Sequence, residues 1–394
     1  MTRPQLEVAD IVRRHGAAFV ATSRAWLTGH HQSVLRAIAQ CRTAALGGHR
    51  DRCDTCAHPH LSYNSCRNRH CPKCLTAARD VWLAARQREL LPVGYVHVVV
   101  TLPHTLSALA LANKRVVYDL LFRATAATLL QVAANPKRLG ATIGGLMVLH
   151  TWGQQLLHHP HLHCVVPAGG LSPDGTRWIH APPRFFLPVK VLATVFRGKF
   201  VAGLREAWAA GRLHLPGDLQ RLEQAAAWRA FLRSLHGQRW GVYAKPPFDS
   251  AGHVLHYLAR YTHRVAIANQ RLVDVTDETV SFRWKDYRHG SAVKIATVSI
   301  EDFLHRFLLH VLPKRFVRIR YVGLLAARCR TAALAQCRRA LAVTPDPPAV
   351  ADPTPTRVAW PCPRCGGPMR IVERFTARQL ALRALLEGLG VDTS

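Results

Sequence analysis

Acidic residues are scarce in this chain of 394 residues, which has 23 Asp and Glu against 53 Lys and Arg. The formal net charge is therefore +30 at pH 7, with histidine counted as neutral. Such an excess of cations indicates a polyanionic partner, for which nucleic acid is the first candidate and a membrane surface the weaker one.

Long apolar runs are also missing, since no stretch approaches the roughly 18 residues that cross a bilayer. The start, Met1-Thr2-Arg3-Pro4-Gln5, lacks the pattern of a signal peptide. We therefore expect no membrane partner and a cytoplasmic, nucleoid-associated location. A Walker-type glycine loop is absent as well, and we expect no nucleotide cofactor. Nothing in the sequence indicates an oligomeric state.

Cysteine is present in quantity, and most of the 11 Cys lie in Cys-x-x-Cys pairs. In an intracellular chain this pattern indicates metal binding rather than disulfides. Because four thiolates satisfy the tetrahedral geometry of zinc, we expect one structural Zn²⁺ site formed by Cys53, Cys56, Cys71 and Cys74. A second set comprises Cys41, His49, Cys66 and His70, for which free thiols and surface histidines are the alternative. In the tail, Cys362 and Cys365 make half of a zinc ribbon, with Cys329 and Cys337 as candidate partners.

Two groups of cations are candidates for DNA contacts. Arg67, Arg69 and Lys73 lie between and beside the cysteines of the expected zinc-binding segment. Cations alternate with apolar residues from Pro313 to Tyr321, so that Arg318 and Arg320 would form a stripe suited to phosphates. An ordinary solvated face is the alternative for this second group.

The stretch from His159 to Val166 alternates polar and apolar residues, as in a strand. His161 and His163 would then point to the same face and could hold one divalent ion. A histidine-rich strand edge is the alternative. Further along, Tyr257 and Tyr261 lie at helical spacing, with Arg264 on the same face as a further candidate DNA contact, opposite an apolar stripe. The alternative is an amphipathic helix with two half-exposed tyrosines.

Taken in order, the chain divides into segments of different character. We expect a helical and zinc-binding, DNA-contacting domain over 1–85 and a nuclease-like domain over 86–270, with a helical insertion at about 189–235. A basic region of β-hairpin and helix over 271–342, a Pro-rich linker over 343–356 and a Cys-x-x-Cys tail over 357–394 follow.

Together these stretches resemble a known family, the two-tyrosine HUH transposases of rolling-circle insertion sequences of the type numbered ninety-one. The resemblance covers the chain from about Cys41 to about Ala327, and its motifs occur in the same order as in the family. The matching stretches are Cys66–Cys74, Val98–His104, His159–His163, Tyr257–Arg264 and Phe282–Gly290. No single motif is specific, but the combination is.

The resemblance implies an α+β fold, in which helices pack on an HUH-nuclease antiparallel sheet. From the residues themselves, we expect a helical and zinc-ribbon-like N-terminal domain before this sheet, and a basic β-rich region and a zinc-ribbon-like tail after it. The resemblance also implies that Tyr257 or Tyr261 attacks single-stranded DNA at the ends of a mobile element or at its target and keeps the 5′ phosphate. His161 and His163 would hold a catalytic Mg²⁺ or Mn²⁺. For the third ligand Gln154 is the expected residue, and His159 and His97 are the alternatives.

Three rival functions explain less of the sequence. A non-catalytic, zinc-dependent DNA-binding regulator accounts for the charge and the cysteines but not for the tyrosine pair. A histidine-triad nucleotide hydrolase accounts only for the local pattern of His159, His161 and His163. A transposase of the three-carboxylate kind has no identifiable triad in this acid-poor chain. Metal-dependent nicking of single-stranded DNA would separate the main hypothesis from the first two.

Overall fold

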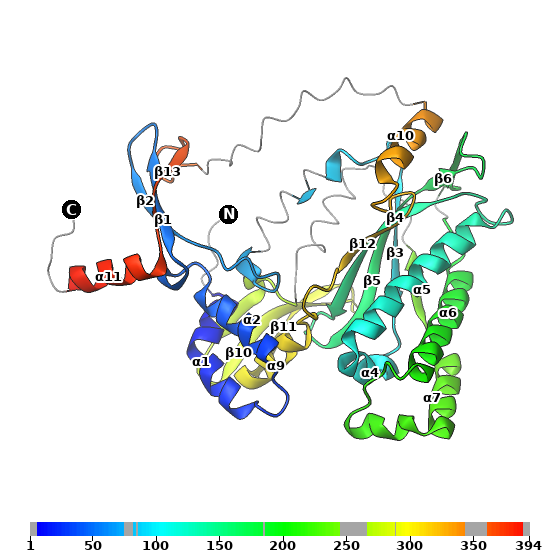
Figure 1. Cartoon of the computed structure of the whole chain (residues 1–394), viewed down its shortest axis with the longest axis horizontal. Coiled ribbons are helices and arrows are strands. Elements are labelled where there is room, and N and C mark those ends of the chain that lie inside the picture. Colours follow the sequence, from blue (N-terminus) through cyan, green and yellow to red (C-terminus); the bar gives the residue numbers. More distant parts are fainter. Residues whose placement is uncertain are drawn as a thin grey trace.

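The computed structural model describes residues 6–74, 82–83, 86–183, 186–244, 266–287, 289–342 and 361–388. Over these ranges the chain combines helices with antiparallel sheets, which confirms the expected α+β class (Figure 1). The segment that carries Tyr257 and Tyr261 lies outside the described residues.

A five-stranded antiparallel sheet, in the order β12-β4-β5-β3-β8, forms the centre of the larger half (Figure 1). The middle strand β5 lies between β4 and β3, so the expected histidine strand has a neighbour on each side. The strands of this sheet are β3 (Tyr95–Thr101), β4 (Gly144–Trp152), β5 (His158–Pro167), β8 (Gly241–Ala244) and β12 (Ile319–Gly323).

One face of the central sheet is covered by helices. Alternate residues such as Val98, Leu162 and Cys164 are fully or almost fully buried there, in one core with side chains of the helices. The helices of this layer are α4 (Ser107–Ala112), α5 (Lys114–Ala134), α6 (Val189–Ala209) and α7 (Ala225–Gly237). The expected helical insertion is therefore part of this layer, since α6 packs on α5 and contributes Phe196 and Phe200 to the core.

Among the described residues, α5 is long and apolar enough by length and composition to cross a membrane. Its apolar residues are interrupted by Asp119 and Arg123, so α5 contains no uninterrupted apolar run of roughly 18 residues. The buried side chains of α5, among them Val117, Leu121 and Leu129, belong to the core beneath the sheet. This burial is what a core helix of a folded domain requires, and the same length and composition occur in such helices.

The opposite face of the sheet changes from apolar to polar along the length of the strands. Towards one end, Tyr95, Leu146, Val148 and Val165 form a small apolar cluster. Towards the other end, the same alternation presents histidines, because the register pairs His150 with His161 and Val148 with His163. The sheet thus has one mostly apolar face, on which His158 and Arg320 make polar contacts with α5, and one face that changes from apolar to imidazole along β4 and β5.

A second core joins the N-terminal helices to a segment that is distant in sequence. Buried residues of α1 (Val8–Thr22) and α2 (Gly29–Gln40) pack with Phe282, Phe303 and Phe307 (Figure 1). The partner elements are β9 (Leu272–Val275), β10 (Thr279–Asp286), β11 (Ala292–Ser299) and α9 (Ile300–Leu309). The expected limits of the domains remain a prediction, but this core contains residues from both the first and the third expected region.

The sequence pattern predicts strands at Arg271–Val275, Thr279–Lys285 and Ala292–Ser299 and a capping box at Ser299 before a helix. The structure confirms the three strands and the cap. Ser299 is the N-cap residue of α9, and its hydroxyl accepts a hydrogen bond of 3.1 Å from the backbone N–H of Asp302. This bond satisfies one of the backbone donors left unpaired at the start of a helix. The last expected strand, from Pro313, begins later, because the chain makes a turn before β12.

The tail returns to the N-terminal region. Strand β13 (Met369–Phe375) pairs antiparallel with β1 (Gly48–Cys53), which also pairs with β2 (Pro59–Tyr63). Helix α11 (Ala377–Gly388) follows β13 and projects from the molecule (Figure 1). At the other end of the molecule, α10 (Arg330–Ala340) packs near the short hairpin of β6 (Gly169–Leu171) and β7 (Trp178–His180).

Candidate functional site

Three histidines converge on the polar part of the central sheet. His161 and His163 lie on the same face of β5, as the alternation predicts, and His150 of β4 lies directly across from His161. Each residue offers a ring nitrogen, and the three nitrogens lie within 4.8 Å of one another. The Nε2 atoms of His161 and His163 are 3.1 Å apart. Two ligand nitrogens about 2.1 Å from one ion, at right angles, would lie roughly 3.0 Å apart, so the spacing fits a shared metal ion.

The outer nitrogens of two of these rings are already engaged. His161 Nδ1 donates a hydrogen bond of 2.7 Å to the carbonyl oxygen of His159. Because a carbonyl oxygen can only accept, Nδ1 carries the proton and Nε2 keeps its lone pair. His163 Nδ1 lies 2.8 Å from His97 Nε2, and the two rings stack at 9°. Such contacts fix the tautomer and the orientation of metal-binding histidines.

The protonation state also suits metal binding. Burial lowers the pKa of His161 to about 4, so its ring is neutral at pH 7. His150 and His163 are buried, and the ring of His150 stacks on Trp152 at a centroid distance of 4.4 Å. A neutral imidazole offers a lone pair to a cation, whereas a protonated one repels it.

Gln154, the expected third ligand, is turned elsewhere. It lies in the turn after β4, where its Oε1 accepts from the backbone N–H of Lys285 at 3.3 Å and its Nε2 donates to the Tyr287 hydroxyl at 3.3 Å. The alternative His97 contacts His163 but is not in the group of three, and the carbonyl of His159 serves His161. His150 is not among the expected ligands, because spacing along the chain favours Gln154, seven residues before His161. Pairing β4 with β5 as a hairpin in the sequence would have placed His150 opposite His161.

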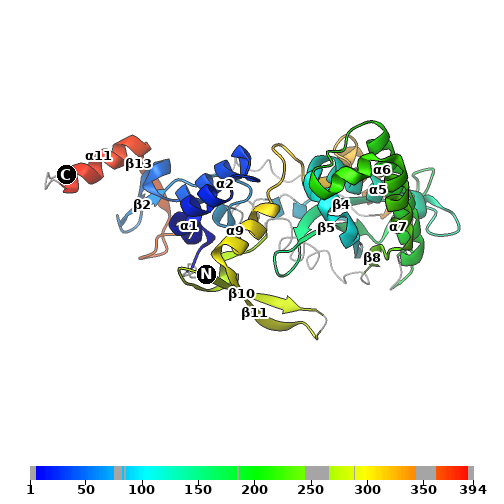
Figure 2. The ribbon, with the colours of Figure 1, turned by 90° about the horizontal axis from the view of Figure 1, so that it is seen from below.

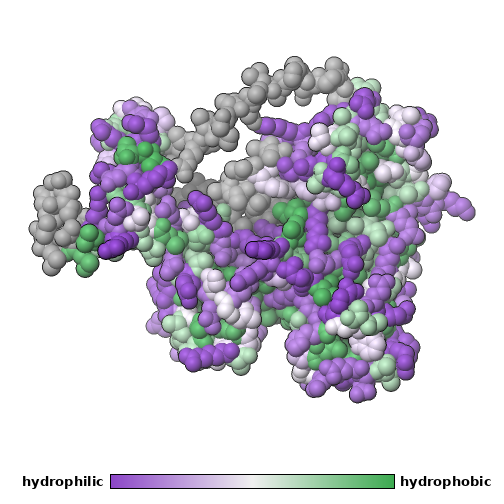
Figure 3. All heavy atoms as spheres, in the orientation of Figure 1, coloured by the Kyte–Doolittle hydropathy of each residue, from purple (hydrophilic) through white to green (hydrophobic). Residues whose placement is uncertain are grey.

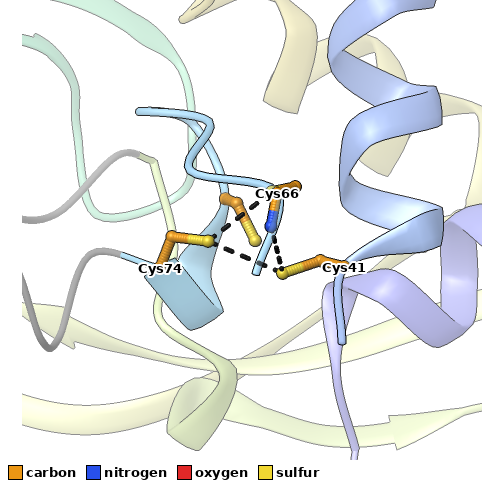
Figure 4. Close-up of side chains that lie close together, drawn as sticks. Cys41, Cys66 and Cys74 are labelled. Carbon is orange, nitrogen blue, oxygen red and sulfur yellow. Dashed lines mark hydrogen bonds between the residues drawn. The ribbon is translucent and has the colours of Figure 1, made fainter. Parts of the chain in front are cut away.

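The first sulfur cluster consists of Cys41, Cys66, Cys71 and Cys74. Cys41 ends α2, and the other three come from the segment after β2 (Figure 4). The Cys74 sulfur lies 3.5 Å from those of Cys41 and Cys66, and in Figure 4 these three side chains point toward one another. Four sulfurs around one zinc ion lie roughly 3.8 Å apart, whereas a disulfide requires about 2.05 Å. The cluster therefore fits a zinc ion, and hydrogen bonds from Cys41, Cys66 and Cys71 lower the pKa of Cys74 toward the thiolate form.

The second sulfur cluster joins the two ends of the chain. Cys53 and Cys56 lie at the turn between β1 and β2, and Cys362 and Cys365 precede β13. The sulfur distances are 3.5 Å from Cys53 to Cys365 and 3.8 Å from Cys56 to Cys362. Backbone N–H groups of Thr55, Cys56, Arg364 and Gly367 donate to cysteine sulfurs at 3.4 Å. The N–H of Cys56 is the main reason why the pKa of Cys53 is lowered to about 6.

The structure thus groups the cysteines differently from the sequence prediction. Cys53 and Cys56 face the tail because β1 pairs with β13, with Cys53 opposite Met369. Cys71 and Cys74 lie instead beside Cys41, beneath α2. Neither expected histidine joins them. The backbone N–H of Leu312 donates to His70 Nε2 at 3.1 Å, and His49 Nε2 lies 3.6 Å from an Asp51 carboxylate oxygen. Cys329 and Cys337 are placed near α10, away from the tail pair.

Most of the cations expected to contact DNA have partners within the protein. Arg69 donates to the carbonyl oxygen of Phe316 at 2.6 Å, and Lys73 forms a buried ion pair with Glu7. Arg320 pairs with Asp119 and lies over the Phe122 ring at 4.1 Å. Burial, with Arg69 nearby, lowers the pKa of Arg318 to about 10. Of the five expected DNA-contacting cations that the structure describes, Arg67 is the exposed one.

The remaining site residues stay predictions. Tyr257, Tyr261 and Arg264 lie outside the described residues, so the structure does not test whether they face the histidines. What the described residues define is an α+β protein with a three-histidine site on an antiparallel sheet and two four-cysteine clusters that could hold zinc. The exposed face shown in Figure 3 is largely hydrophilic, with apolar residues in small patches.

Comparison with known proteins agrees with this architecture. The family described as "Putative transposase" matches residues 144–333, and the "Transposase zinc-binding domain" matches residues 11–102. "Putative transposase y4qJ" of Sinorhizobium fredii is 55% identical over 344 residues, which are 87% of this chain and 86% of that protein. "Transposase for insertion sequence element IS801" of Pseudomonas savastanoi pv. phaseolicola is 31% identical over 303 residues, 75% of this chain and 70% of that protein. No solved structure matches the chain.

The chain therefore belongs to the transposases of the insertion-sequence-ninety-one type that carry an N-terminal zinc-binding domain. The family makes it a DNA-processing enzyme with DNA as its partner. The zinc-binding domain and the cysteine clusters support structural zinc.

Proposed function

We propose that this transposase cuts and rejoins single-stranded DNA at the ends of a mobile element, through a covalent bond between a 5′ phosphate and Tyr257 or Tyr261. The observation that carries the proposal is the group of His150, His161 and His163 on one face of the central sheet. A tight group of imidazoles is suited to a cation, and a cation is what a phosphodiester needs beside it when a nucleophile attacks.

The donor set favours one of the two expected metals. All three ligands of the cluster are imidazoles, whereas Mg²⁺ is usually bound by carboxylates and water. Mn²⁺ accepts imidazole nitrogen more readily, so Mn²⁺ is the better fit to these residues. When bound, such an ion polarises the scissile phosphate. The protein's own contribution is to hold His161 and His163 by the contacts with the His159 carbonyl and His97.

The proposed reaction conserves the energy of the phosphodiester. The phenolic oxygen of the attacking tyrosine bonds to phosphorus and gives up its proton. The bond from phosphorus to the 3′ oxygen breaks, and that oxygen leaves as a free 3′-OH after taking up a proton. The reverse reaction, with the 3′-OH of a second strand, transfers the 5′ end and regenerates tyrosine. Two tyrosines permit two such transfers without release of the first end, and no nucleotide cofactor is consumed.

The test uses the purified full-length chain and single-stranded oligonucleotides with the sequences of its element's ends, with Mn²⁺ added. We expect a covalent protein–DNA adduct that survives denaturation, and mass spectrometry should locate the phosphate on Tyr257 or Tyr261. The double variant Tyr257→Phe, Tyr261→Phe should form no adduct, because Phe keeps the ring but removes the nucleophile. The matched control is Tyr63→Phe, which removes a phenol from β2 and should leave adduct formation unchanged.

Two outcomes contradict the proposal. Nicking that persists in the double variant would make water or another side chain the nucleophile. Sequence-specific DNA binding without any cleavage, in protein that holds its zinc, would favour a regulator that binds DNA but does not cut it.

A further inference from the structure

A two-stranded ribbon projects from the molecule beside the histidine sheet. Strands β10 and β11 pair over eight residues each and extend beyond the short neighbouring strand β9 (Figure 2). Because successive residues of a strand point to opposite faces, the ribbon has an inner and an outer face. The inner face begins with Val280 and Phe282, which are fully buried in the second core.

The outer face combines cations with β-branched residues. The register sets Ser281 opposite Thr297, Arg283 opposite Ile295, and Lys285 opposite Val293. Ile295 and Val293 are 59% and 62% exposed, although both are apolar. Neighbouring exposed apolar side chains on one face, rimmed by polar residues, are typical of interaction surfaces.

Charge separates the two faces further. On the inner face, Lys294 pairs with Asp286 at 2.8 Å. On the outer face, no ion pair to Arg283 or Lys285 occurs within the part of the chain that the structure describes. None of the six paired outer positions carries an acid. The face is therefore positively charged and apolar, in a protein with a formal charge of +30.

The ribbon is fixed to the strands that carry the histidines. Arg271 Nε donates to the carbonyl oxygen of Arg283 at 2.7 Å, and Lys285 N–H donates to Gln154 Oε1 at 3.3 Å. A second hydrogen bond joins Arg271 to the Gln154 carbonyl oxygen. Since Gln154 lies in the turn between β4 and β5, the free edge of β10 is attached to the same hairpin that presents His150 and His161.

We propose that the outer face of the β10–β11 ribbon binds duplex DNA in the major groove, next to the strand that reaches the histidines. The major groove, about 12 Å wide, admits a two-stranded ribbon. Arg283 and Lys285 would contact phosphates, while Val293 and Ile295 are suited to thymine methyl groups. Single strands are usually held by stacked aromatic rings, and the six outer positions carry none. Tyr287 is an exposed aromatic residue near the tip of the ribbon, but its hydroxyl accepts a hydrogen bond from Gln154 Nε2. This inference rests on the chain's action on DNA and not on the phosphotyrosine step.

The test measures equilibrium binding of the full-length protein, without divalent metal added to the assay, to a 20-base-pair duplex and to a single strand of the same length. The variant carries Arg283→Gln and Lys285→Gln. Its duplex affinity should fall about 10-fold or more, and the slope of log K against log salt should become shallower by roughly 2, since each lost phosphate contact removes about 0.9. Single-strand affinity should stay within about 2-fold. The control, Arg229→Gln with Arg233→Gln on the exposed side of α7, should change neither.

A further variant, Ile295→Thr, keeps the β-branched shape and should weaken duplex binding without changing the salt slope. Zinc content and circular dichroism should match the parent protein in every variant. Unchanged duplex binding in the double variant would overturn the proposal. An equal loss for duplex and single strand would overturn the assignment to duplex DNA. Because no cleavage is measured, either result leaves the tyrosine chemistry to its own test.

Discussion

The sulfur clusters and the histidine cluster differ in what holds their ligands together. Cys53, Cys362 and Met369 are the buried residues of a very small core, and they join segments from opposite ends of the chain. The histidines lie on two paired strands whose reverse face packs into the largest core of the molecule. At the second sulfur cluster, a metal ion supplies the stability that the small core cannot. At the histidine cluster, the fold places the ligands whether or not an ion is bound.

The first sulfur cluster lies between these extremes. Cys41 and Cys71 are fully buried in the second core, and the loop that carries Cys71 is anchored through His70 and Arg69 to the chain at Leu312 and Phe316. Loss of this ion should therefore disturb both halves of the protein. The comparison teaches that metal sites in one chain can have opposite relations to folding.

The largest effect is expected from Cys71→Ser, which removes one ligand of the buried cluster. Zinc should fall from about two ions per chain to one. Unfolding of both halves should become less cooperative, because apparent zinc-binding energies of about 10–16 kcal/mol support such sites. The measurements are metal analysis and thermal unfolding.

The Cys362→Ser variant should also lose one zinc ion, but it should release only β13 and α11. The control is Cys329→Ser, which lies outside both clusters. Equal unfolding in both cluster variants would contradict the distinction drawn here.

The next effect concerns activity rather than folding. His150→Ala should reduce Mn²⁺-dependent cleavage by about 1000-fold while the melting temperature and zinc content change little, because the strands are held by their core. Gln154→Ala, the matched control, should cleave within about 10-fold of the parent protein, since its side chain contacts Lys285 and Tyr287 instead. In a direct titration, Mn²⁺ should bind more weakly to the His150→Ala variant than to the parent protein, whereas Gln154→Ala should keep the parent affinity. If Gln154→Ala lost metal affinity and His150→Ala did not, the histidine assignment would be wrong.

The smallest effect lies at the seam between the halves and depends on pH. His310 is buried, lies 2.9 Å from the Leu156 carbonyl oxygen, and contacts Thr151 of β4. Burial lowers the pKa of His310 to about 3 from an unfolded value of 6.5. The unfolded chain therefore binds the proton first, so this stability is complete above pH 6.5 and is lost as the pH falls toward 3.

Between pH 7 and pH 4 the loss from His310 should be about 3 kcal/mol, since each pKa unit corresponds to about 1.4 kcal/mol. Urea unfolding of the parent protein and of His310→Gln over this range should give a shallower pH dependence for the variant. Exposed His236→Gln is the control, because its ring is solvated in both states. Identical slopes for the parent protein and His310→Gln would refute the prediction.

Local patterns in the sequence correctly predicted most elements. Alternation predicted β5, with His161 and His163 on one face, and the helical pattern over about 189–235 predicted the stretch that forms α6 and α7. The Ser299 cap was also correctly predicted. These features depend on neighbours within a few residues, and their physical causes are the pleat of a strand, the turn of a helix and the hydrogen bonding of helix ends.

Tertiary structure alone decided which distant residues meet. Cys-x-x-Cys pairs indicate metal binding but not which pairs share an ion, and the pairing of β1 with β13 brings Cys53 to Cys365. In the same way, Arg69 and Lys73 have the charge of a DNA contact, yet in the fold Arg69 donates to the Phe316 carbonyl oxygen and Lys73 pairs with Glu7. His150 became a ligand candidate only when β4 lay beside β5. The sequence determined the kinds of side chain available, while the register of the sheets determined their partners, because a ligand set is defined by distance in space and not along the chain.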